Sequence, residues 1–144
     1  MREKNNAEKI MYKATLRKIK ELNPERLYDE YSITLNDGCM GSYDFFVECN
    51  GRKIGFELMN RPTKGKLKEK LRYLDFVDKY VFVLPVGSLE LYKRHSVKCF
   101  EPLTRPKFFP KEFASKKLFV WLCSIDEKRI VEYARFSRIF NVKK

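Results

Sequence analysis

Residues 43–59, YDFFVECNGRKIGFELM, decide the expected fold. Asn50-Gly51 stands between two runs rich in aromatic and β-branched residues. Such a pair is the strongest short signal for a β-hairpin, because a type I′ turn needs positive φ at both of its central positions. We therefore predict strands over 43–49 and 52–59 that are joined by this turn.

The turn also predicts how the two strands pair. Counting outward from it gives one apolar face made of three cross-strand pairs: Phe45 with Phe56, Val47 with Ile54, and Tyr43 with Leu58. The opposite face holds three more: Glu48 with Lys53, Phe46 with Gly55, and Asp44 with Glu57. A slip of one residue would mix the two faces, so their separation supports this register.

The segments on either side of the hairpin predict the rest of the fold. Residues 3–21 lack Gly and Pro and predict a basic helix with Ile10, Met11 and Ala14 on its buried side. Residues 31–35 alternate like a strand and lead into a turn at 36–38.

After the hairpin the pattern predicts a helix over 65–75, a buried parallel strand over 80–84, a short helix over 88–95, a loop over 101–112, a strand over 117–123 and a final helix over 126–140. The order of elements predicts an α/β fold in which helices flank a mixed β-sheet. We expect one domain over residues 1–144.

The composition favours a polyanionic partner. The chain has 31 Lys and Arg against 19 Asp and Glu, a formal net charge of +12. Such an excess favours nucleic acid first and an anionic membrane surface second, and the alternative is merely a lysine-rich surface. Residues 1–9 are polar, and no run approaches the ~20 apolar residues of a membrane span. We therefore expect a cytoplasmic protein without a membrane segment.

Several kinds of site are not indicated. The four cysteines form no CxxC pair and His95 is the only histidine, which argues against a structural zinc site and against a histidine-activated nucleophile. The chain also lacks the glycine-rich phosphate-binding motifs, so nucleotide hydrolysis is not expected.

The predicted register brings two acids together. Asp44 and Glu57 would lie directly opposite each other with Cβ atoms about 5 Å apart, an arrangement that destabilises a sheet. Mg²⁺ is the obvious compensating group, because it binds one or two carboxylates and keeps several waters. The carbonyl of Leu58 would add a ligand. The alternatives are that one carboxylate pairs with a nearby lysine, or that both are solvated at a sheet edge.

Two basic segments suit contact with phosphate groups. Their cations are Arg61, Lys64 and Lys66 after the hairpin, and Arg105, Lys107 and Lys111 further along the chain. Three phenylalanines, at 108, 109 and 113, are interleaved with the second segment and would either stack on bases or pin a loop to the core. We favour core packing for the phenylalanines and phosphate contact for the charges.

The stretch 43–59 resembles the core motif of the PD-(D/E)XK nuclease superfamily, which includes restriction endonucleases, archaeal Holliday-junction resolvases and RecB-like nucleases. The core of that family has the order helix, three strands, helix, strand, and the resemblance covers about residues 3–85. It implies a restriction-endonuclease-like fold and hydrolysis of DNA phosphodiester bonds that depends on Mg²⁺ or Mn²⁺.

By this resemblance, Asp44 matches the aspartate of the motif and Glu57 its second acid, and both would be metal ligands. Met59 stands where the motif has a lysine, and Tyr43 stands where it has a proline. Methionine cannot stabilise developing negative charge as an ammonium group does. Three explanations remain open: the role has moved to Lys64, Lys66 or Lys70, cleavage is slow without it, or catalysis is lost and the domain only binds.

Some members of the family also use an acid from the first helix, for which Glu8 and Glu21 are the candidates. Members often dimerise to cut both strands, so a homodimer is a further expectation. The sequence thus predicts either a metal-dependent nuclease acting on DNA or a non-catalytic nucleic-acid-binding protein on the same fold.

Overall fold

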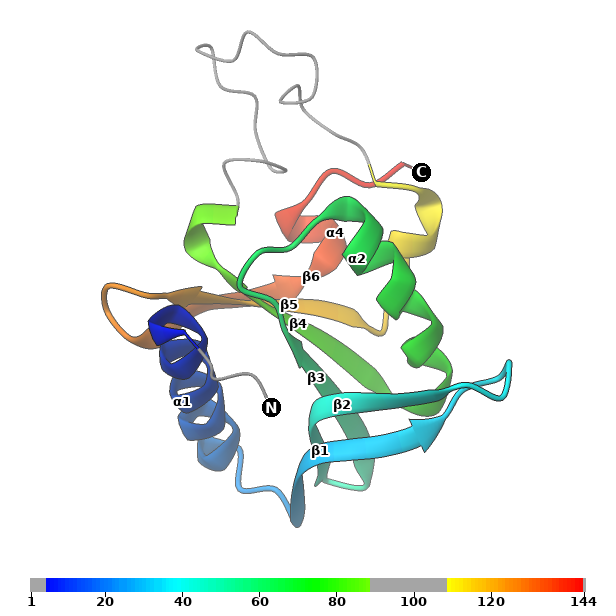
Figure 1. Ribbon diagram of the computed structural model, residues 1–144, viewed down its shortest axis with the longest axis horizontal. Helices are drawn as coiled ribbons and strands as arrows, with labels where there is room; N and C mark the ends of the chain where they lie inside the picture. The colour runs from blue at the N-terminus through cyan, green and yellow to red at the C-terminus, as the bar shows by residue number, and fades with distance from the viewer. Residues whose placement is uncertain (1–4, 89–108, 144) are drawn as a thin grey trace, which may run out of the picture.

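The fold, seen in a computed structural model that describes residues 5–88 and 109–143, is built on one six-stranded sheet (Figure 1). In chain order the main elements are α1 (Asn6–Glu21), β1 (Arg26–Thr34), β2 (Met40–Cys49), β3 (Arg52–Leu58), α2 (Lys64–Lys70), β4 (Lys79–Pro85), β5 (Leu118–Ser124), β6 (Arg129–Arg135) and α4 (Phe136–Ile139). Short 3₁₀ helices are η1 (Leu71–Phe76), η2 (Val86–Ser88) and η4 (Lys111–Ala114).

The strands lie in the order β1-β2-β3-β4-β5-β6. β1, β2 and β3 are antiparallel neighbours, β3, β4 and β5 are parallel, and β6 runs antiparallel to β5. The predicted α/β fold with a mixed sheet is therefore confirmed, as is the prediction that residues 80–84 form a parallel strand. This strand is buried on both faces, as a central parallel strand must be.

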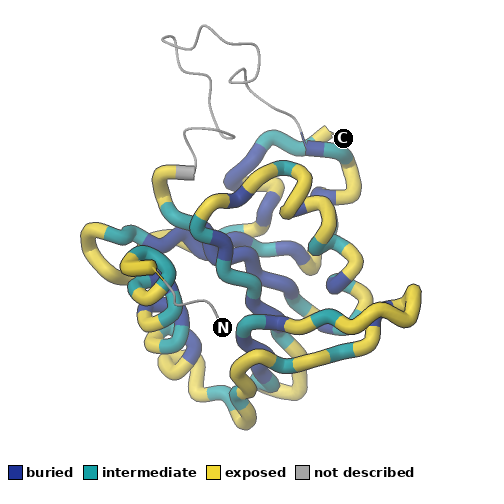
Figure 2. The backbone as a smooth tube through the Cα atoms, in the orientation of Figure 1, coloured by how far each residue is buried: buried dark blue, intermediate teal, exposed yellow. Residues whose placement is uncertain are grey.

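Helices lie on both faces of the sheet (Figure 1), and each face carries its own core. On one face α1 contributes Met11, Ala14 and Ile19; on the other face α2, η1 and α4 contribute Leu67, Tyr73 and Phe136. Figure 2 shows the central strands as the most buried part of the chain, with the outer side of α1 exposed. The site described below lies where α1 and α2 approach the sheet from opposite faces.

The hairpin forms as predicted around Asn50-Gly51. Both residues have positive φ, 54° and 76°, as a type I′ turn requires. Phe45 pairs with Phe56 and Val47 pairs with Ile54, so the predicted register is confirmed for this part of the hairpin.

The first two predicted helices are confirmed with small changes. α1 begins after Asn5, whose side chain accepts a hydrogen bond from the backbone N–H of Glu8 at 2.8 Å. Ile10 is only partly buried, and Thr15 and Ile19 complete the buried side instead. The second helix is α-helical only as far as Lys70 and then tightens into η1.

The predicted final helix over 126–140 is wrong. Residues 129–135 form strand β6, and only Phe136–Ile139 are helical. The turn before β6 contains no glycine and places Lys128 at φ 57°, an uncommon conformation for lysine, so the sequence gives no turn signal there. The open edge of β5 supplies backbone partners for a strand, and this tertiary pairing overrides the local preference for helix.

The predicted position of Tyr43 is also wrong. Tyr43 does not share a face with Phe45, because it packs with Phe46 in the core on the α2 side, whereas Phe45 packs on the α1 side. The alternation of side chains between the two faces of β2 breaks at Asp44, opposite which Glu30 of β1 has φ 53°. The ring of Tyr43 lies over Gly55 of β3, where a Cβ atom would meet ring carbons at 2.5 Å.

Gly55→Ala should therefore destabilise the protein by about 1–3 kcal/mol, the range for overpacking a core, because the ring of Tyr43 would have to move. Urea denaturation followed by circular dichroism measures the change. Gly65→Ala in α2 is the matched control: its Cβ meets nothing within 4 Å, and it should leave stability unchanged or raise it by about 0.5–1 kcal/mol. Equal stability of wild type and Gly55→Ala would contradict this packing.

The core interpretation of the aromatic segment is confirmed for two of its three phenylalanines. Phe109 and Phe113 are fully buried against α4. Arg105, Lys107, Phe108, His95 and the predicted helix over 88–95, apart from Ser88, lie outside the described residues. Across residues 5–88 and 109–143, no helix is long and apolar enough to cross a membrane.

Candidate functional site

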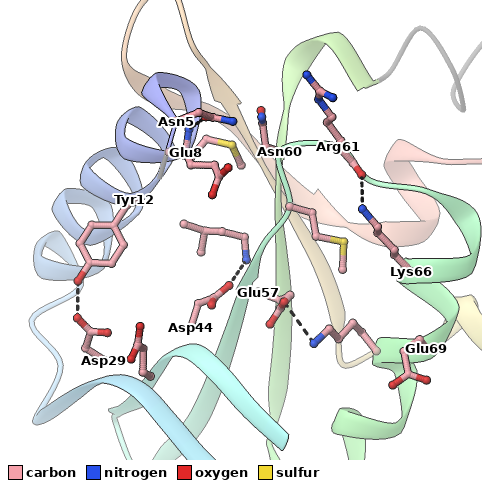
Figure 3. Close-up of a pocket in the computed structure, with 15 residues that line it drawn as sticks. Asn5, Glu8, Tyr12, Asp29, Asp44, Glu57, Asn60, Arg61, Lys66 and Glu69 are labelled. Atoms are coloured by element: carbon pink, nitrogen blue, oxygen red, sulfur yellow. Dashed lines mark hydrogen bonds and ion pairs between the residues drawn. The ribbon is translucent and has the colours of Figure 1, made fainter. Parts of the chain in front are cut away.

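A cavity of about 550 Å³ opens where β2 separates from β3 (Figure 3). It is bounded by the first half of α1, by β1, by the segment that follows β3, and by α2. Six carboxylates line it: Glu8, Asp29, Glu30, Asp44, Glu57 and Glu69. Three cations accompany them: Arg61, Lys66 and Lys70. An acidic cavity in a chain of net charge +12 is a site suited to a cation.

Asp44 and Glu57 lie in this cavity, as the sequence predicts for a shared site. The hairpin ladder ends at the pair Phe45 with Phe56, and beyond it the side chain of Asp44 spans the gap. Its Oδ2 atom accepts a hydrogen bond of 2.7 Å from the backbone N–H of Leu58. Asp44 is therefore held in place by the strand that carries Glu57.

Glu57 is not a solvated carboxylate at a sheet edge. β3 is an interior strand, and the Glu57 side chain is only 13% exposed. Burial, and after it the charge of Asp44, raises the pKa of Glu57 from its ordinary 4.5 to about 7, against the opposing effect of Lys70. The repulsion expected from the sequence is thus present, and at neutral pH the second carboxylate is held near its point of ionisation.

Lys70 is the lysine that the fold brings to Glu57. It is the last residue of α2, and its Nζ lies 3.4 Å from Oε2 of Glu57. Burial lowers the pKa of Lys70, but the carboxylate of Glu57 and nearby groups outweigh that effect and raise it overall, so the ammonium stays charged. The pairing of one carboxylate with a lysine, which the sequence left open, therefore occurs.

The other lysine candidates lie elsewhere. Lys66 lines the cavity, where its Nζ donates to the carbonyl of Arg61 at 3.4 Å. The Nζ of Lys64 lies 5.8 Å from the ring centroid of Phe109, and Lys64 does not line this cavity. Lys111 is exposed on η4 and is likewise outside the cavity.

Met59, at the position of the motif lysine, does line the cavity. Its side chain is largely buried, with 7% exposure, and its backbone N–H donates to the carbonyl of Val83 at 3.0 Å. A longer polar side chain at this position would therefore start from the wall of the cavity. Leu58, the predicted source of a carbonyl ligand, also lines it.

The two candidate acids of α1 lie in different places. Glu8 lines the cavity, and its carboxylate points into it (Figure 3). Glu21 lies at the opposite end of α1 and pairs with Lys18 at 3.5 Å. Of the two candidates, only Glu8 belongs to the site.

Tyr12, Asp29 and Glu30 also line the cavity, and sequence reasoning missed them. Tyr12 donates a short hydrogen bond to Asp29, which is the main reason that the pKa of Tyr12 rises to about 12. The predicted first strand began at residue 31, whereas β1 begins at Arg26 and so includes both acids. The sequence signal that could have identified Asp29 and Glu30 is their position as adjacent acids in a strand close to the pair Asp44 and Glu57.

The donor set suits a hard divalent cation. Within residues 5–88 and 109–143, no group of three or more His, Cys, Asp or Glu side chains is gathered tightly enough to hold a metal ion. Mg²⁺ does not need such a group, because it binds through one or two carboxylates and retains water. Asp44 and Glu57 fit that requirement in an acidic cavity.

Comparison with known proteins assigns no family to the chain. No protein-family model matches it, and no curated protein matches its sequence. Its function therefore has to be inferred from the cavity and the side chains that line it.

Proposed function

We propose that this protein is a metal-dependent phosphodiesterase of the PD-(D/E)XK type that acts on DNA, with Asp44 and Glu57 as metal ligands and Lys70 in the role of the motif lysine. The observation that carries the proposal is the cluster at the open end of the hairpin. There, two carboxylates face one cavity and an ammonium group lies 3.4 Å from one of them.

The order of elements supports the proposal. α1, the three strands β1 to β3, α2 and β4 follow one another in the order that the family core has. The acids stand on β2 and β3, and the helix that follows β3 supplies Lys70. A restriction-endonuclease-like fold is thus the specific form of the observed α/β architecture that we propose.

In this proposal Asp44 and Glu57 hold the cation, which would neutralise charge on the scissile phosphate and activate water. The backbone N–H of Leu58 keeps the carboxylate of Asp44 oriented. Lys70 stabilises the negative charge that develops on the phosphate oxygens, the role that Met59 cannot fill. Arg61 and Lys66, on the wall of the cavity, contact the flanking phosphates.

A non-catalytic nucleic-acid-binding protein is the second candidate. It is favoured by Met59 at the lysine position and by the net charge of +12. In that case the same basic surface would bind DNA, and the acids would be a retained but inactive site. The two candidates differ in whether the protein cleaves DNA when Mg²⁺ is present or only binds it.

The test is cleavage of end-labelled single-stranded, duplex and branched DNA by the wild-type chain with Mg²⁺, with Mn²⁺ and with EDTA. We expect cutting that needs the metal and disappears in Asp44→Asn, because this change removes a ligand charge and keeps the shape of the side chain. Binding without cutting in every condition would support the second candidate. Cutting that persists in Asp44→Asn would show that the activity does not come from this site.

A further inference from the structure

A second cavity of about 900 Å³ lies on the α1 face of the sheet, at the opposite end of α1 from the acidic cavity. Its floor comes from β3, β4, β5 and β6, and its walls come from the end of α1 and from α4. We call it the basic aromatic groove, after Phe119, Trp121, Tyr133, Lys18, Lys79, Arg135 and Arg138. The proposed nuclease site uses none of these residues.

The aromatic residues form a platform on neighbouring strands. Trp121 of β5 pairs directly with Tyr133 of β6, and Phe119 pairs with Arg135. Tyr133 is 63% exposed, whereas Trp121 is 8% exposed and packs edge-on against Phe56 with ring centroids 4.8 Å apart. The groove therefore presents one open ring beside a fixed, recessed one.

The charges around the platform are almost all positive. Among residues 5–88 and 109–143, Glu21 is the only acid in the lining, and it pairs with Lys18 at 3.5 Å. The Nζ of Lys79 lies 5.1 Å from the ring centroid of Phe119, and the Nζ of Lys18 lies 5.4 Å from that of Tyr133. Both ammonium groups thus lie over ring faces, whereas in the first cavity acids outnumber cations by six to three.

The combination of cations and aromatic rings indicates which class of ligand the groove binds. Four cations around aromatic rings disfavour an apolar helix as a partner. They match a polymer that carries one negative charge per monomer, as nucleic acid does. A lipid surface would need apolar side chains that project outward, but Trp121 and Phe119 line the floor of a hollow. Stacking on Tyr133 also requires an unpaired base, which duplex DNA does not offer.

We propose that the basic aromatic groove binds single-stranded nucleic acid, with a base stacked on Tyr133 and the neighbouring phosphates at Lys79, Arg135 and Arg138. This binding does not rest on the proposed nuclease activity, because it uses other residues and needs no metal. It would hold a single strand at the other end of α1 from the acidic cavity.

Trp121 is the only tryptophan of the chain, so its fluorescence reports directly on the groove. We expect a dT₁₂ oligonucleotide to quench this emission, in EDTA and in the Asp44→Asn background, so that cleavage plays no part. Inorganic polyphosphate carries the charge without bases and should quench far less. Equal quenching by polyphosphate and dT₁₂ would overturn the stacking contact.

Matched variants test the two kinds of contact by fluorescence anisotropy with labelled dT₁₂. Tyr133→Ala should weaken binding by about tenfold or more, and Tyr133→Phe should bind within about twofold of wild type. Tyr28→Ala, which removes an exposed tyrosine on β1, should have no such effect.

Arg135→Gln should lower the salt dependence of binding by about 0.7 in the slope of log affinity against log salt. Arg129→Gln is the control for charge on the same strand, because Arg129 lies outside the groove and pairs with Glu127 at 2.7 Å. Wild-type affinity and slope in both Tyr133→Ala and Arg135→Gln would overturn the proposal. So would a preference for phosphatidylglycerol vesicles or an acidic protein over dT₁₂.

Discussion

Lys70→Ala should lower the rate of Mg²⁺-dependent DNA cleavage by about 10²–10³-fold, the usual effect of removing one group that stabilises charge in a transition state. Lys70 is the described lysine whose ammonium contacts a proposed metal ligand, at 3.4 Å from Glu57. Single-turnover cleavage at saturating metal measures the effect, and a metal titration of each variant separates it from weakened Mg²⁺ binding.

Two sets of variants make this test specific. Lys64→Ala should cleave at the wild-type rate, because Lys64 lies by Phe109 and outside the cavity. Lys66→Ala should weaken DNA binding more than it lowers the single-turnover rate. Met59→Lys in the Lys70→Ala background should restore part of the activity, since position 59 lines the same cavity. Full activity in Lys70→Ala would refute the displaced-lysine assignment.

The choice among the three lysines shows where sequence reasoning stops. Lys64, Leu67 and Lys70 are spaced by three residues and so share one side of α2. Leu67 is fully buried, which turns that side toward the sheet. The spacing alone could favour Lys64 and Lys70 over Lys66. Only the path of the chain after β3 decides that the end of α2, and not its start, reaches Glu57.

The hairpin was predictable because its information is local. A turn with two positive φ values fixes the pairing of Phe45 with Phe56 and brings Asp44 and Glu57 to one site. The kink at Glu30 was not predictable, because a glutamate at positive φ carries no sequence signal. At the same level of the sheet Tyr43 changes face and the pairing of β2 with β3 ends, which is where the cavity opens.

Contacts distant in sequence were the other unpredictable part. Glu8 reaches the cavity because α1 packs across the sheet, a placement set by tertiary packing and not by the spacing of residues 8 and 44. β6 exists because β5 has an edge to pair, and with it Tyr133 and Arg135 enter the basic aromatic groove. A helix over 126–140 would have placed these two residues differently, so the missed strand also concealed that groove.

Glu57→Gln should stabilise the metal-free protein above pH 7 by about 1–3 kcal/mol. The pKa of Glu57 is raised from its ordinary 4.5 to about 7 by burial and by Asp44, so the folded state holds the proton more tightly than the unfolded state does. The stabilising contribution of Glu57 to the free energy of unfolding is therefore fully present below about pH 4.5 and is lost as the pH rises to about 7. At 1.36 kcal/mol per pKa unit, the loss is on the order of 3 kcal/mol. Glutamine at position 57 removes the negative charge that causes this loss of stability.

Urea denaturation at pH 4, 6 and 8 in EDTA measures this difference, which should be small at pH 4 and largest at pH 8. Glu48→Gln is the control, because Glu48 lies on β2 outside the cavity and pairs with Arg26 at 3.4 Å, where such surface pairs contribute about 0–1 kcal/mol. Mg²⁺ at 1,000 times its Kd should reverse the order, because a ligand that binds only the folded wild type then adds about 4.1 kcal/mol, more than the loss of about 3 kcal/mol. A wild type that is more stable than Glu57→Gln at pH 8 without metal would mean that Lys70 already compensates the buried carboxylate. In that case the acid pair would need no cation for stability.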